Sequence, residues 1–499
     1  MRRTGLLVFL SVLVIYLSFP TKNFYWDGIM FAQEIETGSG VAWFLHPNHL
    51  LYNPLGRELW LAANAIGLNL RALTVLQIIS MVTGAATVAL MFCVLIETGA
   101  STYVSLCLAL AFAFSATWWR FATDAASYVP STFLIVLSLW LLVRNDRPSP
   151  VTLGLVISGA MLLHQLAALF VPAAALALWL RNKEQPRSSR LMRLVGFVLA
   201  AGIPTVGLYV LVFAVEHQSR TLPEFMRWVV SHSQDVSFSF DLPKNIWTSV
   251  VGHVRLVLGG NLRLVLAQKS PVSLVAAMGL GVSLLLLVRR LAQNPPGFLV
   301  SVRSDVRRLL PVLLLWWATY ALFLVVWLPR NTFYRLFYVP ALVILCSGLI
   351  PDVKTRYNRL AVAVAALFLL NFGFYIYPQT KPDANPTLQV ADEMRGIWRP
   401  GDTVYWDVFR MENRTVRYFN PQVEWKELWG RAYTSQIETS FKEGGDVWFD
   451  STALAEFRQK DQELEAWLLA NCRINESYEF PVGDHMVGFT RLQKLKSPK

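Results

Sequence analysis

The sequence predicts an α-helical polytopic membrane protein that ends in a small α/β domain. Three observations support this fold class. Hydrophobic residues make up 54% of the 499 residues and charged residues 16%, and the mean hydropathy of +0.42 is well above that of water-soluble chains. Apolar segments long enough to cross a bilayer follow one another to about residue 377. Beyond residue 378, charged residues become frequent and apolar runs become short.

The basic residues indicate membrane orientation and not nucleic-acid binding. The net charge is +12, from 45 Lys and Arg against 33 Asp and Glu. These cations lie mainly in short loops between apolar segments, which is the positive-inside pattern of a membrane protein. The four cysteines are scattered with no CxxC spacing, so they predict neither a metal cluster nor a disulfide framework.

The first 20 residues set the orientation of the chain. They have a basic start and an apolar core like a signal peptide, but no small-residue cleavage site, so we expect a retained signal anchor. Arg2 and Arg3 place the N-terminus in the cytoplasm and the loop 21–71 outside. Continuing this alternation gives about 11 spans, with the N-terminus inside and the C-terminus outside.

The first outer loop, residues 21–71, carries residues suited to chemistry. Asp27 follows Trp26 soon after the first span, and His46 and His49 lie further on among prolines, asparagines and aromatic residues. Carboxylates and imidazoles are the groups that most often carry protons or contact substrates in a site. We therefore expect a functional loop here.

Two further segments complete the outer side of the N-terminal half. Residues 54–70 place apolar residues at helical spacing between polar ones, which predicts a helix lying in the membrane interface. The spans 72–96 and 103–118 then lead inward and out again, to Asp124. Asp124 is thus expected on the same side as Asp27.

The apolar run 150–180 is expected to cross the membrane twice. Cations flank both of its ends, and one crossing would leave one group of them outside. Each arm of the hairpin has only about 15 residues, which is too short to span the hydrocarbon core of about 30 Å. The tip, with His164 and Gln165, would then lie below the outer surface, where polar groups need protein or a water-filled cavity around them. We infer a cavity that opens outward.

The second half of the chain adds an aromatic outer loop and two outward arginines. The loop 216–270 mixes aromatic and charged residues, which predicts interfacial helices and a lid. A span at 272–288 returns inside, and a span at 309–328 leads out to Arg330 and Arg335. These two cations depart from the positive-inside bias, so we expect them to have a specific role.

Residues 379–499 predict a soluble α/β domain on the outer side, large enough to bury its own core. Alternating patterns and Gly or Pro turns mark its elements. Asp402, Asp407 and Asp446 fall at expected strand ends, and we assign them no catalysis. The expected elements are a helix at 385–398, strands at 402–407 and 446–450, a helix at 453–470 and strands at 477–482 and 485–492.

This organisation resembles the GT-C superfamily of membrane glycosyltransferases. The resemblance is carried by the acidic residue after the first span (Tyr25-Trp26-Asp27-Gly28), the interfacial helix, Asp124 in the second outer loop and an outer C-terminal domain. It is closest to the bacterial family that resembles protein O-mannosyltransferases and aminoarabinose transferases, whose late tyrosine- and proline-containing span is similar to residues 333–345. Many members have two adjacent acidic residues where this chain has Asp27 and Gly28.

The resemblance implies an inverting glycosyltransferase with a polyprenyl-phosphate-linked sugar as donor. Asp27 would be the base, with Asp124 as a second catalytic carboxylate, and Arg330 and Arg335 would hold the leaving phosphate, since guanidinium pairs bidentately with phosphate oxygens. The other residues expected at the substrate are Trp26, His46, His49, Tyr52, His164 and Tyr334. The active site would face outward from a bacterial inner membrane, in a transmembrane domain of residues 1–378.

Each of these residues also has a structural interpretation. Asp27 could cap the helix that follows it, and Asp124 could cap the next span or pair with Arg120. His46 and His49 are spaced to ligate a metal, but no third ligand is evident, so a divalent cation stays possible without a ligand set. His164 could be a satisfied buried histidine. Arg330 and Arg335 could snorkel to lipid headgroups.

The main rival to an enzyme is a transporter or lipid flippase, because buried polar residues in a helix bundle also mark translocation routes. Large asymmetric outer loops and the lack of an internal repeat in the sequence favour the enzyme. A non-catalytic membrane assembly or receptor protein would leave the polar residues of the first outer loop unexplained. The expected partners are a lipid-linked sugar, membrane lipid and an acceptor that the sequence does not identify, with no nucleic acid.

Overall fold

The computed structural model describes residues 2–38, 44–145, 147–217, 221–231, 238–259, 304–350, 357–407, 410–427, 433–460, 462–483 and 485–495. The chain divides into two compact units. The bundle unit comprises Met1–Thr21 and Glu34–Pro378, and the sheet unit comprises Lys22–Gln33 and Gln379–Lys499. The span expected at 272–288 lies outside the described residues.

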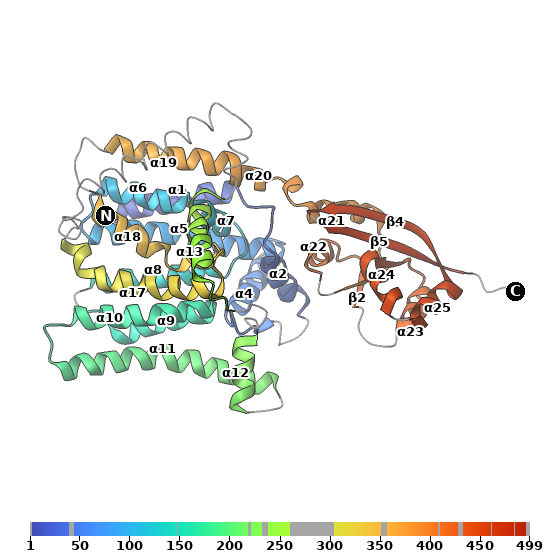
Figure 1. Cartoon of the computed structure of the whole chain (residues 1–499), viewed down its shortest axis with the longest axis horizontal. Coiled ribbons are helices and arrows are strands. Elements are labelled where there is room, and N and C mark those ends of the chain that lie inside the picture. The colour runs from blue at the N-terminus through green and yellow to red at the C-terminus, as the bar shows by residue number, and fades with distance from the viewer. Residues whose placement is uncertain are drawn as a thin grey trace. The chain divides into compact units, whose positions relative to one another are not determined.

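The bundle unit is built of helices, many of them running nearly parallel to one another (Figure 1). Their apolar residues face both the interior and the outside, as expected for helices surrounded by lipid. In chain order its longer helices are α1 (Arg2–Ser18), α2 (Trp26–Thr37, whose first residues belong to the sheet unit), α4 (Tyr52–Ala65), α5 (Ala72–Glu97), α6 (Thr102–Ala113), α7 (Ala116–Ala122), α8 (Tyr128–Arg144), α9 (Pro150–Leu163), α10 (Val171–Arg181), α11 (Arg187–Glu216), α12 (Leu222–Val230), α13 (Leu242–Leu258), α17 (Ser304–Trp327), α18 (Val339–Leu349) and α19 (Tyr357–Asn371).

Four helices in the described part of the chain are long and apolar enough to cross a membrane: α5, α11, α17 and α19 with its extension to Gln379. A fifth is obtained if α6 and α7 count as one span, broken by a bend of 68°. The sequence predicts one continuous span at 103–118, and the bend is the difference. Shorter apolar helices, among them α8, α9 and α18, account for other expected spans. The number of about 11 spans stays a prediction.

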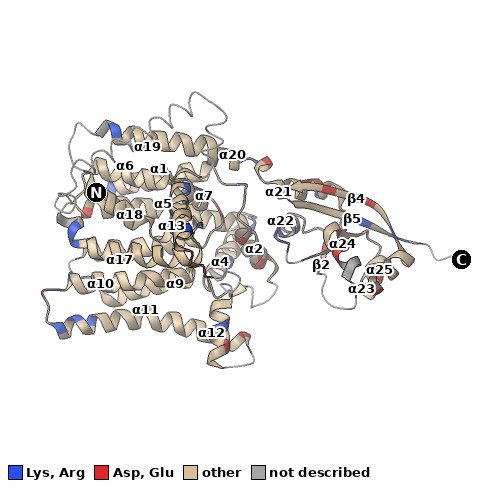
Figure 2. Cartoon of the chain, in the orientation of Figure 1, with Lys and Arg blue, Asp and Glu red and all other residues tan. Residues whose placement is uncertain are grey.

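The apolar run 150–180 folds as a hairpin, as the sequence predicts. A single 3-10 turn, η1 (Gln165–Phe170), separates α9 from α10. The ends of the two arms that lie opposite the tip meet, since Arg181 donates to the carbonyls of Val143 (3.1 Å) and Asn145 (3.3 Å) just before α9. Figure 2 shows Lys and Arg gathered at the end of the bundle where α11, α17 and α19 begin. The cations that predict the hairpin thus lie together at one end.

Two helices form the described part of the segment 216–270. α12 packs Phe225 and Trp228 against Tyr209 and Val212 of α11. α13 runs crosswise to the bundle helices (Figure 1) and contacts α7 and α17. One face of α13 buries small and polar residues and the opposite face exposes apolar ones, the division expected of an interfacial helix.

The sheet unit is a five-stranded mixed sheet with the strand order β2-β1-β3-β5-β4. β2 (Glu424–Glu427), β1 (Thr403–Trp406) and β3 (Val447–Asp450) are parallel, whereas β4 (Cys472–Val482) and β5 (His485–Lys494) form an antiparallel hairpin beside β3. One apolar cluster packs α21 (Pro386–Ile397) and α22 (Met411–Phe419) on one face of the sheet. A second cluster packs α23 (Tyr433–Lys442), α24 (Ser451–Lys460) and α25 (Gln462–Asn471) on the other face.

The sheet unit departs from the sequence prediction in several places, and its helices α22 and α23 were not expected from the sequence. The helix expected at 453–470 is two helices, α24 and α25, which contact each other. β2 is an additional strand that the alternation pattern did not reveal, because its residues Glu-Trp-Lys-Glu lie at the edge of the sheet and are mostly charged. The strands expected at 402–407, 446–450, 477–482 and 485–492 all form.

Candidate active site

Asp124 lies in a rigid turn between α7 and α8. Its side chain is fully buried, and its Oδ1 accepts a hydrogen bond from the backbone N–H of Ala125 (2.8 Å). The carbonyl of the preceding Thr123 accepts bonds from the Gln77 side chain (3.0 Å) and from the Thr21 N–H (3.3 Å). These bonds join three segments of the bundle unit at the turn, so the position of Asp124 is fixed by its backbone neighbours.

Aromatic rings connect this turn to the hairpin tip and to the late 3-10 turn η3 (Tyr334–Phe337). Tyr128, the first residue of α8, has its ring centroid 5.0 Å from that of His164 and 5.6 Å from that of Tyr334. The His164 ring lies 5.8 Å from the Tyr334 ring. The structure therefore brings two of the predicted site residues, His164 and Tyr334, into one cluster around Tyr128.

The loop with His46, His49 and Tyr52 lies against the same hairpin tip. The carbonyl of Asn48 accepts a bond from the Gln165 N–H (2.8 Å), and the Leu51 N–H donates to the carbonyl of Leu162 (2.9 Å). The rings of His46 and His49 stack with centroids 4.5 Å apart, and both side chains are buried. His46 Nδ1 accepts a bond from the Asn48 N–H (3.2 Å), so that nitrogen is unprotonated.

Arg335 is fully buried, and its donors are directed at protein groups. Its Nε donates to the carbonyl of Asn331 (2.8 Å), and its Nη2 donates to the carbonyl of Pro329 (2.6 Å) and to the Ser249 hydroxyl (3.0 Å). Its Nη1 donates to the Tyr338 hydroxyl (2.6 Å). Arg335 thus ties η3 to α13.

His253 of α13 completes this network. Because the Arg335 Nη1 can only donate, the Tyr338 hydroxyl accepts from it and donates its own hydrogen to His253 Nε2, 2.9 Å away. The other ring nitrogen, Nδ1, then donates to the carbonyl of Ser249 (2.9 Å). Burial, and then the charge of Arg335, lower the pKa of His253, which agrees with this neutral form.

The helix α13 can approach Arg335 because it has a glycine at the contact. A Cβ on Gly252 would lie 3.0 Å from both the Nε and the Nη2 of Arg335. Only a residue without a side chain allows the guanidinium to lie flat against the helix. The position of the arginine therefore depends on Gly252 as well as on its hydrogen bonds.

Arg330 differs from Arg335 although it lies in the same turn. It is exposed, and within the described residues it has no hydrogen bond or ion pair. Arg335 is hydrogen-bonded to carbonyls and hydroxyls, and no carboxylate pairs with it among the described residues. The turn therefore combines one accessible cation with one buried cation that lacks an anionic neighbour there.

Trp26 and Asp27 belong to the sheet unit. Asp27 is the second residue of α2, inside its first turn and not before the helix, and is partly buried. Trp26 is 42% exposed. The segment is held by hydrogen bonds of Lys22 to Gln379 (2.7 Å) and to the Asn385 side chain (3.1 Å).

No group of three or more His, Cys, Asp or Glu side chains could hold a metal ion among the residues that the structure describes.

Three residues of the candidate site were not predicted from the sequence. They are Tyr128 in the aromatic cluster at the hairpin tip, and His253 and Tyr338 in the network of Arg335. Tyr128 begins α8 four residues after Asp124, which lies outside that helix, so no helical spacing links the two. His253 follows Ser249 by four on α13, the helical spacing that places two side chains on one face. That spacing is the signal that could have revealed His253.

No family model matches the sequence, and no curated protein matches it either. Solved structures do match. ArnT from Cupriavidus metallidurans in the apo state superposes with a TM-score of 0.62 at 12% identity, over 98% of this chain and 98% of that chain. The same protein bound to undecaprenyl phosphate gives a TM-score of 0.59 at 10% identity, over 98% and 97%.

A third structure, the S. cerevisiae protein O-mannosyltransferase Pmt1-Pmt2 complex bound to the sugar donor, gives a TM-score of 0.33 at 17% identity, over 44% of this chain and 34% of that one. The two whole-chain matches show that this chain has the fold of ArnT. The resemblance predicted from the sequence is confirmed at the level of the fold, and function does not follow from fold alone.

Proposed function

We propose that this protein is a membrane glycosyltransferase that moves a sugar from a polyprenyl-phosphate donor to an acceptor on the outer face of the membrane. The observation that carries the proposal is the match of nearly the entire chain, bundle and sheet units together, to an enzyme structure that holds undecaprenyl phosphate. The buried polar side chains of the bundle unit support it, since such groups in a membrane bundle serve a function.

The reaction forms one bond and breaks another at the anomeric carbon of the sugar. An acceptor oxygen attacks that carbon from the face opposite the phosphate, and the bond to the phosphate oxygen breaks, so the configuration inverts. Asp27 takes the proton of the acceptor hydroxyl as general base. Polyprenyl phosphate leaves with the bonding electrons, and nearby cations stabilise its developing charge.

Arg330 and Arg335 divide the task of holding the phosphate. The accessible guanidinium of Arg330 is suited to direct, bidentate contact with phosphate oxygens. Arg335 has its donors committed to η3 and α13, so it acts by its charge and by positioning the turn that carries Arg330. A buried cation without a carboxylate partner gains from an anion nearby, and the donor phosphate supplies one.

The sugar is held by the cluster at the hairpin tip. On this proposal the sugar contacts His46, His49 and Tyr52, whose loop lies against the hairpin tip, and His164 and Tyr334, whose rings lie close to each other. Asp124 would be the second catalytic carboxylate. Neutral imidazoles and tyrosine hydroxyls donate and accept hydrogen bonds, as sugar hydroxyls require. Trp26 would stack on an apolar sugar face or on the lipid. On this proposal, residues 1–378 form the transmembrane domain, residues 379–499 form the outer domain and the membrane is the bacterial inner membrane.

The test is transfer from a panel of polyprenyl-phosphate sugars by the purified protein in lipid vesicles. We expect product with at least one donor, and a loss of about 10²-fold or more in kcat for Asp27→Asn, because that variant keeps the shape but cannot accept the proton. Asp392→Asn, at an exposed carboxylate on α21, is the matched control and should keep full activity. Equal turnover of Asp27→Asn and wild type would remove Asp27 as the base.

A further inference from the structure

The sheet unit contains a topological switch point. From β1 the chain passes through α22 on one face of the sheet to β2, and from β3 it leaves through α24 on the opposite face. β1 and β3 are neighbouring parallel strands, so their carboxyl ends lie side by side while the following helices diverge. In open α/β sheets, ligands bind in the crevice that this divergence creates.

The structure has a pocket of about 260 Å³ at this place. After β1, the start of α22 contributes Arg410, Glu412 and Asn413, and the last residue of β3, Asp450, forms the floor. The remaining wall is the beginning of β5, residues 485–487. The volume is below the range of about 300–1,000 Å³ for drug-sized ligands, so it suits a ligand the size of a monosaccharide.

The charges around the pocket disfavour an anion. Glu412 and Asp450 line it, and the single arginine, Arg410, is already paired with Glu456 (3.2 Å) and lies 4.0 Å from Asp407. Burial raises the pKa of the Asp450 carboxyl in spite of hydrogen bonds from backbone N–H groups and the nearby Arg410. Arg410 also lies 3.8 Å from Asp450, so the arginine of the pocket is already surrounded by carboxylates.

The polar groups suit hydroxyls instead. Carboxylates accept hydrogen bonds, the guanidinium donates them and the Asn413 amide does both, which is the mixture that vicinal hydroxyls require. Asp450 is held in place by the N–H groups of Thr452 (3.0 Å) and Ala453 (3.2 Å) and by the Asn413 side chain. The floor of the pocket is therefore preorganised before a ligand arrives.

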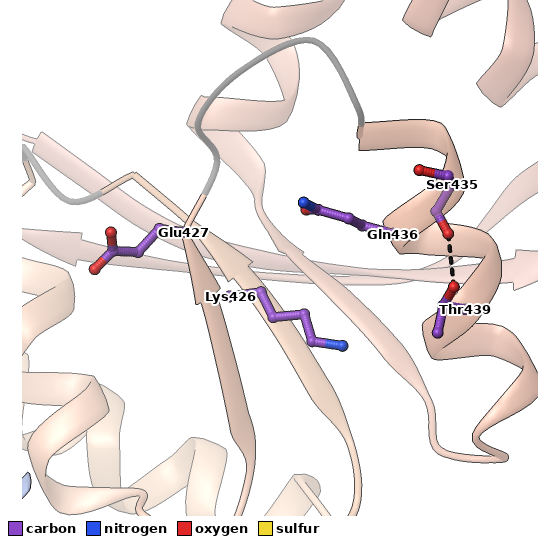
Figure 3. Close-up of a pocket in the computed structure, with 5 residues that line it drawn as sticks. All are labelled: Lys426, Glu427, Ser435, Gln436 and Thr439. Carbon is purple, nitrogen blue, oxygen red and sulfur yellow. Dashed lines mark hydrogen bonds between the residues drawn. The ribbon is translucent and has the colours of Figure 1, made fainter. Parts of the chain in front are cut away.

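A second, larger hollow in the sheet unit provides a contrast. It has a volume of about 460 Å³ and is lined by residues of β2 and α23, with the Lys426 side chain between them (Figure 3). Lys426 is paired with Glu424 (3.1 Å) and Glu443 (3.6 Å) on the edge of the sheet. The hollow shares no lining residue with the pocket at the switch point, so we assign it no ligand and use Glu427, one of its lining residues, as a control.

We propose that the pocket at the carboxyl ends of β1 and β3 binds a monosaccharide unit that is neutral or carries an amine. The choice of a sugar as the ligand rests on the proposed transferase function, whereas the location and the charge preference rest on the topology and the residues of the pocket. The sheet unit would then hold a sugar of the acceptor or of the product. The pocket residues contact ligand and take no part in the transfer reaction.

The experiment is ligand-observed NMR titration of the full-length protein in lipid nanodiscs. The probes are the methyl glycosides of glucose, glucosamine and glucuronic acid, and inorganic phosphate. We expect saturable binding of one or both of the first two probes and none of the anionic ones. Glu412→Gln and His485→Ala should each weaken binding by about tenfold, because each variant alters a hydrogen-bonding side chain of the pocket. Glu427→Gln should leave it unchanged.

Three results would overturn the proposal: no saturable binding of any neutral or amino sugar, preferred binding of glucuronide or phosphate, or equal binding by Glu412→Gln, His485→Ala and wild type. Transfer from polyprenyl-phosphate sugars is measured on the same preparation. Transfer without sugar binding refutes this site and leaves the transferase standing. Sugar binding without transfer supports the site and counts against the transferase.

Discussion

Two polar clusters of this molecule, one in each unit, differ in how fully their side chains are hydrogen-bonded within the protein. In the bundle unit, Arg335 donates to the Tyr338 hydroxyl, that hydroxyl donates to His253 Nε2, and His253 Nδ1 donates to the Ser249 carbonyl, so all three side chains are paired within the protein. In the sheet unit, Arg410 and Glu412 lie around a pocket of about 260 Å³ that is open to ligand. A closed network stabilises the structure, whereas an open one is available for binding. Stability measurements should separate the two clusters.

The largest expected effect is that of Arg335→Leu. It removes the partner of two carbonyls and two hydroxyls that are buried between η3 and α13. A buried polar group left without a partner costs about 1–3 kcal/mol, so we expect a loss of several kcal/mol in the free energy of unfolding. Thermal unfolding in nanodiscs measures it. The control is Arg330→Leu at the exposed arginine, which should change stability by about 0.5 kcal/mol or less.

The next effect is that of Tyr338→Phe. The variant keeps the ring but removes the hydroxyl that joins Arg335 to His253. One buried hydrogen-bond donor and one acceptor lose their partner, so we expect a cost of about 1–3 kcal/mol, below that of Arg335→Leu. Tyr334→Phe, at the half-buried neighbour on η3, is the matched control for loss of a tyrosine hydroxyl. Equal stability of Tyr338→Phe and wild type would show that the network is not closed.

A smaller effect is a pH dependence that comes from His253. Its pKa is lowered by burial and by Arg335, so the folded protein resists a proton that the unfolded chain accepts below about pH 6.5. Stability should therefore fall as the pH is lowered from 7 through 6.5, down to the lowered pKa of the folded state. Thermal unfolding from pH 7.5 to 5 should show a shallower decline for His253→Asn than for wild type. An unchanged slope would contradict a neutral, buried His253.

The smallest effect on stability is expected in the open cluster. Glu412 is only partly buried and lines the pocket without an ion pair in the part of the chain that the structure describes. Glu412→Gln should change the free energy of unfolding by about 0.5 kcal/mol or less, while it weakens sugar binding. Thermal unfolding of the same samples as the NMR titration provides the comparison. A large loss of stability would place Glu412 in the structural framework of the sheet unit.

The sequence predicted the parts of the fold that depend on local composition. The cations on both sides of the run 150–180 predicted a hairpin, and the bonds of Arg181 to Val143 and Asn145 confirm that its ends meet. The bend between α6 and α7 was missed because the segment stays apolar through Trp118, so composition does not mark the break. The split between α24 and α25 was missed because polar, mostly helix-forming residues continue across it, without a Gly or Pro to mark the break.

The candidate site was predicted in its parts but not in its assembly. His164 and the loop 46–54 were both expected to be functional, yet they meet through backbone bonds such as that of Gln165 to Asn48, which no side-chain pattern reveals. Arg330 and Arg335 have the same chemistry in the sequence. Their difference in burial comes from α13, whose Ser249 lies 86 residues before Arg335. Long-range packing of this kind cannot be read from local spacing.

The most direct test of the central claim is to measure cleavage of the donor and movement of the uncleaved donor in one set of sealed vesicles. The protein is reconstituted with a doubly labelled polyprenyl-phosphate sugar, and release of free polyprenyl phosphate is measured together with movement of the intact lipid-linked sugar across the bilayer. If the protein is a glycosyltransferase, we expect polyprenyl phosphate to be released in an amount equal to the glycosylated acceptor. The rate of this release should fall about 10²-fold in Asp27→Asn. Movement of the intact lipid-linked sugar without release would contradict the account and identify a flippase.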